Sequence, residues 1–225
     1  MSRYERLELL IGKEKVDKLK SSEIIIFGLG GVGSYVCETI ARSFVGKITL
    51  VDYDKVTESN INRQLCALDS TVGRYKTEVM AERIHLISPE TEVKIINKRY
   101  TVENRSEFDL NKYDYVVDAI DTISAKIDIA KFCFENEIPL ISVMGTGNKL
   151  HPELLQISDI NKTSVCPLCK VMRRELKKRN IKKLTVVYST EEPKVKYSDV
   201  ISSCAFVPAA AGVMAGSRVI NDLIG

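Results

Sequence analysis

Two kinds of apolar pattern alternate along the chain. Runs of about five apolar residues predict buried strands, and longer segments with apolar residues every three or four positions predict amphipathic helices. Their alternation is typical of a parallel sheet with crossover helices. The predicted strands are Glu23–Phe27, Lys47–Val51, Val93–Asn97, Tyr115–Asp118, Leu140–Val143, Leu154–Ile157 and Leu184–Ser189, and the predicted helices are Tyr4–Leu19, Gly33–Phe44, Lys76–Ile87, Ser124–Asn136, a basic helix beginning near Pro167, and Pro208–Leu223.

These elements predict an α/β fold with a Rossmann-like, mostly parallel sheet and flanking helices. A chain of 225 residues is long enough for one such domain with a full core. The net charge of +3 and the 28% of charged residues describe an ordinary globular protein, so any affinity for nucleic acid must come from a local basic patch.

A glycine-rich turn joins the first predicted strand to the next helix, with glycines at Gly28, Gly30, Gly31 and Gly33. Such a turn lets backbone N–H groups approach a phosphate at a helix N-terminus. Asp52 ends the following strand, where a carboxylate accepts a hydrogen bond from a ribose hydroxyl. This fingerprint alone is compatible with either a dinucleotide or ATP.

A second polar cluster separates these two ligands. Splitting a triphosphate requires positive groups near the leaving pyrophosphate, whereas hydride transfer does not. Arg63 lies in the segment Ser-Asn-Ile-Asn-Arg-Gln, and Lys76 opens a predicted helix. Asp121 follows a strand at the edge where α/β ligands bind, and one carboxylate plus phosphates is a usual set of ligands for Mg²⁺. The cluster favours ATP and Mg²⁺.

Several motifs in residues 20–150 together resemble the ubiquitin-activating-type superfamily that includes ThiF and MoeB. They are Gly-Leu-Gly-Gly-Val-Gly-Ser, Asp-Tyr-Asp-Lys-Val, Ser-Asn-Ile-Asn-Arg-Gln, Gly-Arg-Tyr-Lys and Asp-Ala-Ile-Asp. The resemblance implies an adenylation fold, in which a carboxylate attacks the α-phosphate of ATP. It implies catalytic roles for Arg63, Lys76 and Asp121, with Asp121 at Mg²⁺, and nucleotide binding by Gly28, Gly30, Gly31, Gly33, Asp52, Asp54, Asn60, Arg63, Gln64 and Lys76.

The second half of the chain is similar to one branch of that superfamily. The segments are Asn161–Leu168, Arg173–Lys177 and Val186–Pro193, and the branch is that of the tRNA threonylcarbamoyladenosine dehydratases. The resemblance implies adenylation of the threonyl carboxylate of the modified adenosine beside the anticodon, followed by cyclisation and release of AMP. Within one domain, 1–225, we therefore expect a nucleotide-binding half, 1–150, and a substrate- and RNA-facing half, 151–225, that includes the terminal helix.

The predicted helix after Pro167 has a strongly basic exposed side. Leu168, Val171, Met172 and Leu176 recur at helical spacing and predict a buried stripe. The opposite side predicts phosphate contacts with RNA, or alternatively only a solvated helix surface. Its basic residues are Lys170, Arg173, Arg174, Lys177, Lys178, Arg179, Lys182 and Lys183, of which we assign Arg173, Arg174, Lys177 and Lys178 to RNA binding.

Other interpretations stay open at this point. An adenylyltransferase that activates the C-terminus of a small sulfur-carrier protein is the main alternative, although such enzymes more often carry two Cys-x-x-Cys pairs. Cys166 and Cys169 form only one pair, which favours two ordinary thiols over zinc. Cys204 has no evident base partner, so a packed thiol is favoured over a nucleophile. A non-catalytic binding module and a dehydrogenase are more distant alternatives.

Further expectations concern partners and location. The resemblance implies a homodimer in which Arg3 or Arg6 reaches the partner's site, and a sulfur-relay protein is a further candidate partner. The segment Thr190–Ser203 is a candidate lid over the substrate. The N-terminus lacks the apolar segment of a secretion signal, and no stretch reaches the about 18 apolar residues of a membrane span. We therefore expect a cytoplasmic protein.

Overall fold

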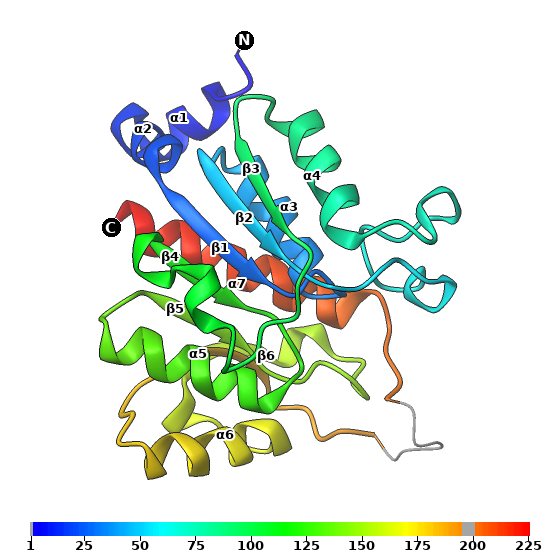
Figure 1. Ribbon diagram of the computed structural model, residues 1–225, viewed down its shortest axis with the longest axis vertical. Coiled ribbons are helices and arrows are strands. Elements are labelled where there is room, and N and C mark those ends of the chain that lie inside the picture. Colours follow the sequence, from blue (N-terminus) through cyan, green and yellow to red (C-terminus); the bar gives the residue numbers. More distant parts are fainter. Residues whose placement is uncertain (1, 195–200) are drawn as a thin grey trace.

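The computed structural model describes residues 2–194 and 201–225, and its centre is a seven-stranded sheet in the order β3-β2-β1-β4-β5-β7-β6 (Figure 1). All neighbouring strands run parallel except β6, which pairs antiparallel with β7. The predicted α/β class with a Rossmann-like, mostly parallel sheet is confirmed. The strands are β1 (Glu23–Phe27), β2 (Lys47–Val51), β3 (Glu92–Ile96), β4 (Tyr115–Asp118), β5 (Leu140–Val143), β6 (Leu155–Asp159) and β7 (Thr185–Ser189).

Helices cover both faces of this sheet. Successive residues of β1 point to opposite sides, so that Ile24 and Ile26 join one core while Ile25 and Phe27 join another. The first core includes α3, α4 and α7, and α7 crosses behind β1 in Figure 1; α5 and α6 pack on the other face. The helices are α1 (Glu5–Ile11), α2 (Lys13–Ser21), α3 (Gly33–Arg42), α4 (Lys76–Ile87), α5 (Ile123–Glu135), α6 (Pro167–Lys178) and α7 (Phe206–Ile224).

The predicted single helix Tyr4–Leu19 is wrong, because two helices, α1 and α2, occupy this segment. Gly12 separates them with a φ of 87°, and its N–H donates to the carbonyl oxygen of Glu8. A left-handed glycine is a common end of a helix. The apolar periodicity continues across the break, so the pattern alone did not reveal it.

Helix α7 lies directly against α3, although the two are far apart in the sequence. A Cβ atom at Gly212 would meet the carbonyl oxygen of Val32 at 2.4 Å, and one at Gly216 would meet the Thr39 side chain at 2.7 Å. The small residues of the terminal helix therefore serve close packing within the chain. No helix in the described ranges is long and apolar enough to span a membrane.

The strand order defines where a ligand binds. From β1 the chain builds outward through β2 and β3, and it then returns to the other side of β1 with β4. In doubly wound sheets the crevice at such a reversal, outside the carboxyl ends of the strands, is the usual ligand site. Here it lies beyond the ends of β1 and β4.

Candidate active site

The glycine-rich turn forms one wall of this crevice. Gly28 has a φ of 85°, and a Cβ atom there would lie 2.8 Å from the carbonyl oxygen of Ala119. Asp52, at the end of β2, fixes the turn because its Oδ2 accepts the Leu29 N–H at 2.6 Å and its Oδ1 accepts the Asp54 N–H at 2.9 Å. Each carboxylate oxygen has a further lone pair, so Asp52 can still accept from a ribose hydroxyl.

A cavity of about 350 Å³ opens at this crevice. This volume is in the range of small-molecule sites. The structure brings ten of the predicted nucleotide-site residues to its lining: Gly28, Gly30, Gly31, Asp52, Asp54, Asn60, Arg63, Gln64, Lys76 and Asp121. Gly33 is not in the lining, since it lies beneath the turn at the start of α3, where a Cβ would be 1.7 Å from the Gly28 carbonyl oxygen.

Arg63 is held over the cavity by the segment that carries it. Its Nη1 donates to the Ser59 carbonyl oxygen and to Asn62 Oδ1, both at 2.8 Å. The segment is itself fixed, because Asn60 Oδ1 accepts the Thr57 N–H at 3.3 Å and closes the turn. These contacts leave other guanidinium N–H groups for an anionic ligand.

Lys76 approaches the same cavity from the first residue of α4. Its Nζ lies 2.9 Å from Asp54 Oδ2, and the Lys76 side chain is only 6% exposed while that of Asp54 is 47% exposed. The Lys76 side chain is thus largely enclosed by protein while still forming part of the cavity lining. Arg63 and Lys76 give this wall two positive charges.

Asp121 follows β4, lines the cavity and is exposed. No group of three or more His, Cys, Asp or Glu side chains that could hold a metal occurs in residues 2–194 and 201–225. A lone carboxylate in the lining is compatible with Mg²⁺, which usually binds through one or two carboxylates together with substrate phosphates and water.

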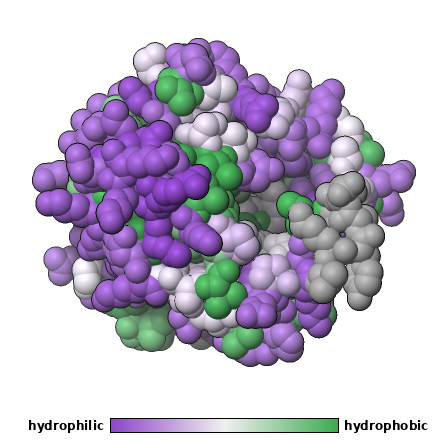
Figure 2. All heavy atoms as spheres, turned by 90° about the horizontal axis from the view of Figure 1, so that it is seen from below, coloured by the Kyte–Doolittle hydropathy of each residue, from purple (hydrophilic) through white to green (hydrophobic). Residues whose placement is uncertain are grey.

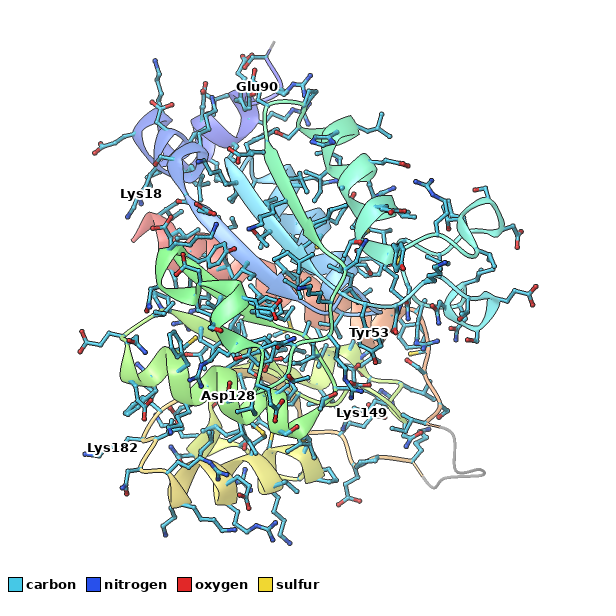
Figure 3. The ribbon with its side chains drawn as sticks, in the orientation of Figure 1. Lys18, Tyr53, Glu90, Asp128, Lys149 and Lys182 are labelled. Carbon is cyan, nitrogen blue, oxygen red and sulfur yellow. The ribbon has the colours of Figure 1, made fainter. Side chains whose placement is uncertain are left out.

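Sequence reasoning missed several lining residues. Arg99 lies 5.5 Å above the centre of the Tyr53 ring, and its Nη2 donates to Thr122 Oγ1 at 3.3 Å. Figure 3 shows Tyr53 on the side of the molecule where the sheet ends. Their position in the sequence could have indicated them. Lys98, Arg99 and Thr146 each follow a strand within a few residues and so lie at the carboxyl edge of the sheet. Ser203 and Pro208 also line the cavity, without such a signal.

The basic helix is α6, and Arg173 differs in its contacts from the exposed basic residues around it. The buried residues of α6 are Cys169, Met172 and Leu176. Arg173 Nη1 turns toward the fold and donates to the Thr163 carbonyl oxygen at 3.0 Å, as well as to the Thr163 hydroxyl. Arg173 therefore anchors the turn before α6 while staying partly exposed, and its assignment to RNA binding stays a prediction.

The remaining residues assigned to RNA binding face solvent. Arg174, Lys177 and Lys178 are exposed, and Glu175 pairs with Arg174 at 3.3 Å and with Lys178 at 2.8 Å. Viewed from below, the left part of the surface, at the horizontal position of α6, is densely hydrophilic (Figure 2). RNA binding by these residues stays a prediction.

The three cysteines discussed above lie in two places. Cys166 and Cys169 are buried at the start of α6, where a hydrogen bond with the Cys169 thiol and the first backbone N–H groups lower the pKa of Cys166. Cys204 Sγ contacts the Lys149 carbonyl oxygen at 3.5 Å. None of the three lines the cavity.

Two further predictions concern segments at the margins of the site. Arg3 and Arg6 lie near Phe44 and Leu86, and neither lines the cavity of its own chain. Helix α1, which includes Arg6, lies near the top of Figure 1. Of the candidate lid Thr190–Ser203, residues 195–200 lie outside the described residues. One flank of this segment is bonded to the loop between β5 and β6, since the Ser202 N–H donates to Asn148 Oδ1 at 3.0 Å.

Comparison with known proteins agrees with this geometry. A Bacillus subtilis protein named tRNA threonylcarbamoyladenosine dehydratase is 45% identical over 242 residues, which cover 100% of this chain and 95% of that protein. Escherichia coli TcdA, a tRNA N6-threonylcarbamoyladenosine dehydratase solved in complex with AMP, superposes with a TM-score of 0.93 at 34% identity and covers 99% of this chain and 94% of its own. The same enzyme in complex with ATP gives a TM-score of 0.92.

A more distant relative matches a smaller part of the chain. The molybdopterin-synthase adenylyltransferase of Salmonella typhimurium is 31% identical, but over only 63% of this chain and 57% of its own length. The profile of the ThiF family matches residues 4–225, and so nearly the whole sequence, with the cavity beyond β1 and β4, belongs to one family. The chain is a member of the ThiF family.

Proposed function

We propose that this chain is an ATP-dependent tRNA threonylcarbamoyladenosine dehydratase. The observation that carries the proposal is a match to dehydratases over essentially the full length, whereas the adenylyltransferase match covers 63% of the chain. The cavity supports it independently, because a glycine-rich turn, two cations and an acidic group surround a space suited to a nucleotide.

The first step is adenylation. An oxygen of the threonyl carboxylate attacks the α-phosphorus of ATP, the bond from that phosphorus to the bridging oxygen breaks, and pyrophosphate leaves. Arg63 and Lys76 stabilise the negative charge that develops on the leaving group. Asp121 would hold Mg²⁺, which supplies further charge neutralisation at the phosphates when bound.

The second step uses the acyl-adenylate formed in the first. A nucleophilic atom of the substrate's own carbamoyl group attacks the activated acyl carbon, loses its proton, and displaces AMP. A ring closes, and the carboxylate oxygen leaves with AMP, so the base loses the elements of water overall. This route needs no enzyme thioester, in keeping with the position of Cys204 outside the cavity lining.

Mass spectrometry of tRNA nucleosides tests the proposal. Transfer RNA that carries threonylcarbamoyladenosine is incubated with the protein, ATP and Mg²⁺, and AMP is measured in parallel. We expect a nucleoside lighter by one water and an equal amount of AMP. An unchanged nucleoside would contradict the proposal, and adenylation of a sulfur-carrier C-terminus would then support the alternative.

We further propose that the enzyme is a cytoplasmic homodimer and that a sulfur-relay protein assists it. Arg3 or Arg6 would enter the partner's cavity, a role supported by the absence of both arginines from the cavity lining of their own chain. If the N-terminal arginine acts in the partner's site, an inactive Arg3→Ala or Arg6→Ala protein mixed with an inactive Arg63→Ala protein would regain activity. The mixed dimer would then contain one site with both arginines intact.

Replacing Asp121 with asparagine is expected to raise the half-saturating Mg²⁺ concentration about tenfold, since a charged ligand becomes a neutral one. Turnover is measured across a Mg²⁺ series at saturating ATP. The control is Asp69→Asn, at an exposed position outside the cavity. A metal response identical to wild type would remove Asp121 from the metal site.

Replacing Arg174 and Lys177 together with alanine is expected to weaken tRNA binding and to lower its salt dependence by about one to two counterions. Binding is measured over a salt series. Lys13→Ala with Lys18→Ala is the matched control, because these lysines lie on α2 at the far end of the molecule, where Figure 3 labels Lys18. An unchanged slope would contradict an RNA-binding role for α6.

A further inference from the structure

Lys126 is a lysine enclosed in the interior of the domain. It lies on the first turns of α5, and its side chain is 1% exposed while that of its partner Asp118 is 0% exposed. Burying two charges costs solvation energy, and replacing a buried ion pair with apolar groups is often neutral or stabilising. Stability alone therefore does not account for this pair.

The ammonium group joins two neighbouring strands. Lys126 Nζ lies 2.9 Å from Asp118 Oδ2 in β4, 3.1 Å from Ser142 Oγ in β5, and 2.9 Å from the Val143 carbonyl oxygen at the end of β5. Ser142 Oγ also donates to Asp118 Oδ2 at 2.6 Å. All three N–H bonds of the ammonium are used, so the geometry of the cluster is fully determined.

Both strands continue directly into the cavity lining. Asp118 Oδ1 accepts the Ile120 N–H at 3.2 Å, which fixes the turn that presents Asp121. β5 ends at Val143, and after two further residues the chain reaches Thr146, which also lines the cavity. The cluster thus sits directly beneath the two segments that face the ligand.

The neighbouring contacts restrict the same turn from other sides. The Lys126 backbone N–H donates to the Thr122 carbonyl oxygen at 3.1 Å, which starts α5 immediately after Asp121. Gly28 lies close to the Ala119 carbonyl oxygen, as described above. The turn between β4 and α5 is therefore in contact with the glycine-rich turn on one side and with Lys126 on the other.

We propose that Lys126 is a positioning residue for adenylation: with Asp118 and Ser142 it sets the place of Asp121 and Thr146 relative to the nucleotide phosphates. This inference rests on the proposed function for its chemistry. A shift of a ligating group by about 1 Å can lower a rate by about 100-fold, so a rigid support beneath Asp121 has a direct effect on turnover.

The test replaces the buried ion pair by neutral groups of similar size, in the double variant Asp118→Asn with Lys126→Met. The Asp118→Asn change is not expected to unfold the protein, because the new amide can still accept from Ile120 and donate to Ser142. We expect a similar melting temperature, turnover lowered about 10- to 100-fold, and a half-saturating Mg²⁺ concentration for thermal stabilisation by ATP raised about tenfold.

Two further variants separate positioning from stability. Tyr115→Phe is the matched control: it removes the hydrogen bond from Tyr115 to Asp222 at the other end of β4, at 2.8 Å, and should lower the melting temperature without changing the Mg²⁺ requirement. Ser142→Ala keeps the ion pair but removes the hydroxyl, and should raise the Mg²⁺ requirement about threefold even if the double variant fails to fold.

Thermal stabilisation by ATP is measured without tRNA. The experiments can therefore contradict the dehydratase function and the positioning role of Lys126 independently of each other. A wild-type protein that leaves the nucleoside unchanged contradicts the proposed function, and the Mg²⁺ requirement still decides the role of Lys126. A folded double variant with wild-type Mg²⁺ requirement and turnover would overturn the inference. If the double variant does not fold, a Ser142→Ala variant with the wild-type Mg²⁺ requirement would overturn the inference. A wild-type protein whose melting temperature does not rise with ATP and Mg²⁺ would also overturn it.

Discussion

Replacing Arg63 with alanine is expected to lower the adenylation rate about 100- to 1,000-fold while leaving the fold intact. The guanidinium is held at the cavity by the Ser59 carbonyl oxygen and Asn62. Such a preorganised cation stabilises charge that exists mainly in the transition state, so its loss lowers kcat more than it weakens ATP binding. Single-turnover formation of AMP and pyrophosphate measures the effect.

Two variants serve as controls for Arg63. Arg74→Ala removes an exposed arginine that pairs with Glu82 outside the cavity, and it should retain full activity. Arg63→Lys keeps the charge but not the planar group of donors, and should recover only part of the rate. An Arg63→Ala protein with wild-type kcat would exclude the residue from the reaction.

Replacing Gly33 with alanine is expected to destabilise the domain by about 3 kcal/mol or more and to abolish thermal stabilisation by ATP. The added Cβ would lie 1.7 Å from the Gly28 carbonyl oxygen and 3.4 Å from the Ala119 Cβ. The first of these neighbours is backbone, so the glycine-rich turn itself must move. Urea unfolding and ATP-dependent melting together measure both effects.

Gly145→Ala is the matched control, because a Cβ at Gly145 meets nothing within 4 Å. This variant should differ little from wild type in both measurements. A Gly33→Ala protein with wild-type stability and an ordinary response to ATP would show that the turn relaxes without cost, and would contradict the packing argument.

Local signals predicted most of the fold and most of the cavity. Residues at strand ends, such as Asp52 and Asp121, were placed correctly because parallel strands deliver their carboxyl ends to one edge. The strand runs were recognised because buried parallel strands are almost continuously apolar. The glycine-rich turn was recognised by its position between a strand and a helix.

Contacts between distant segments could not be predicted from local patterns. Arg173 has the same helical spacing as its exposed neighbours, and only the turn at Thr163 decides that its guanidinium points inward. Lys126 was not singled out, since a lysine in an amphipathic helix ordinarily faces water. Its three acceptors belong to β4 and β5, which no helical pattern reveals.

The contact between α7 and α3 has a consequence for synthesis of the protein. Helix α7 is the last element of the sequence, yet it covers Val36 and Ile40 of α3, and its Pro208 lines the cavity. While α7 is still inside the ribosome, the nascent sheet has an uncovered apolar face and an incomplete nucleotide site. Until α7 has docked, the nascent chain exposes the kind of apolar surface that promotes aggregation, and ATP can stabilise the fold fully only after that docking.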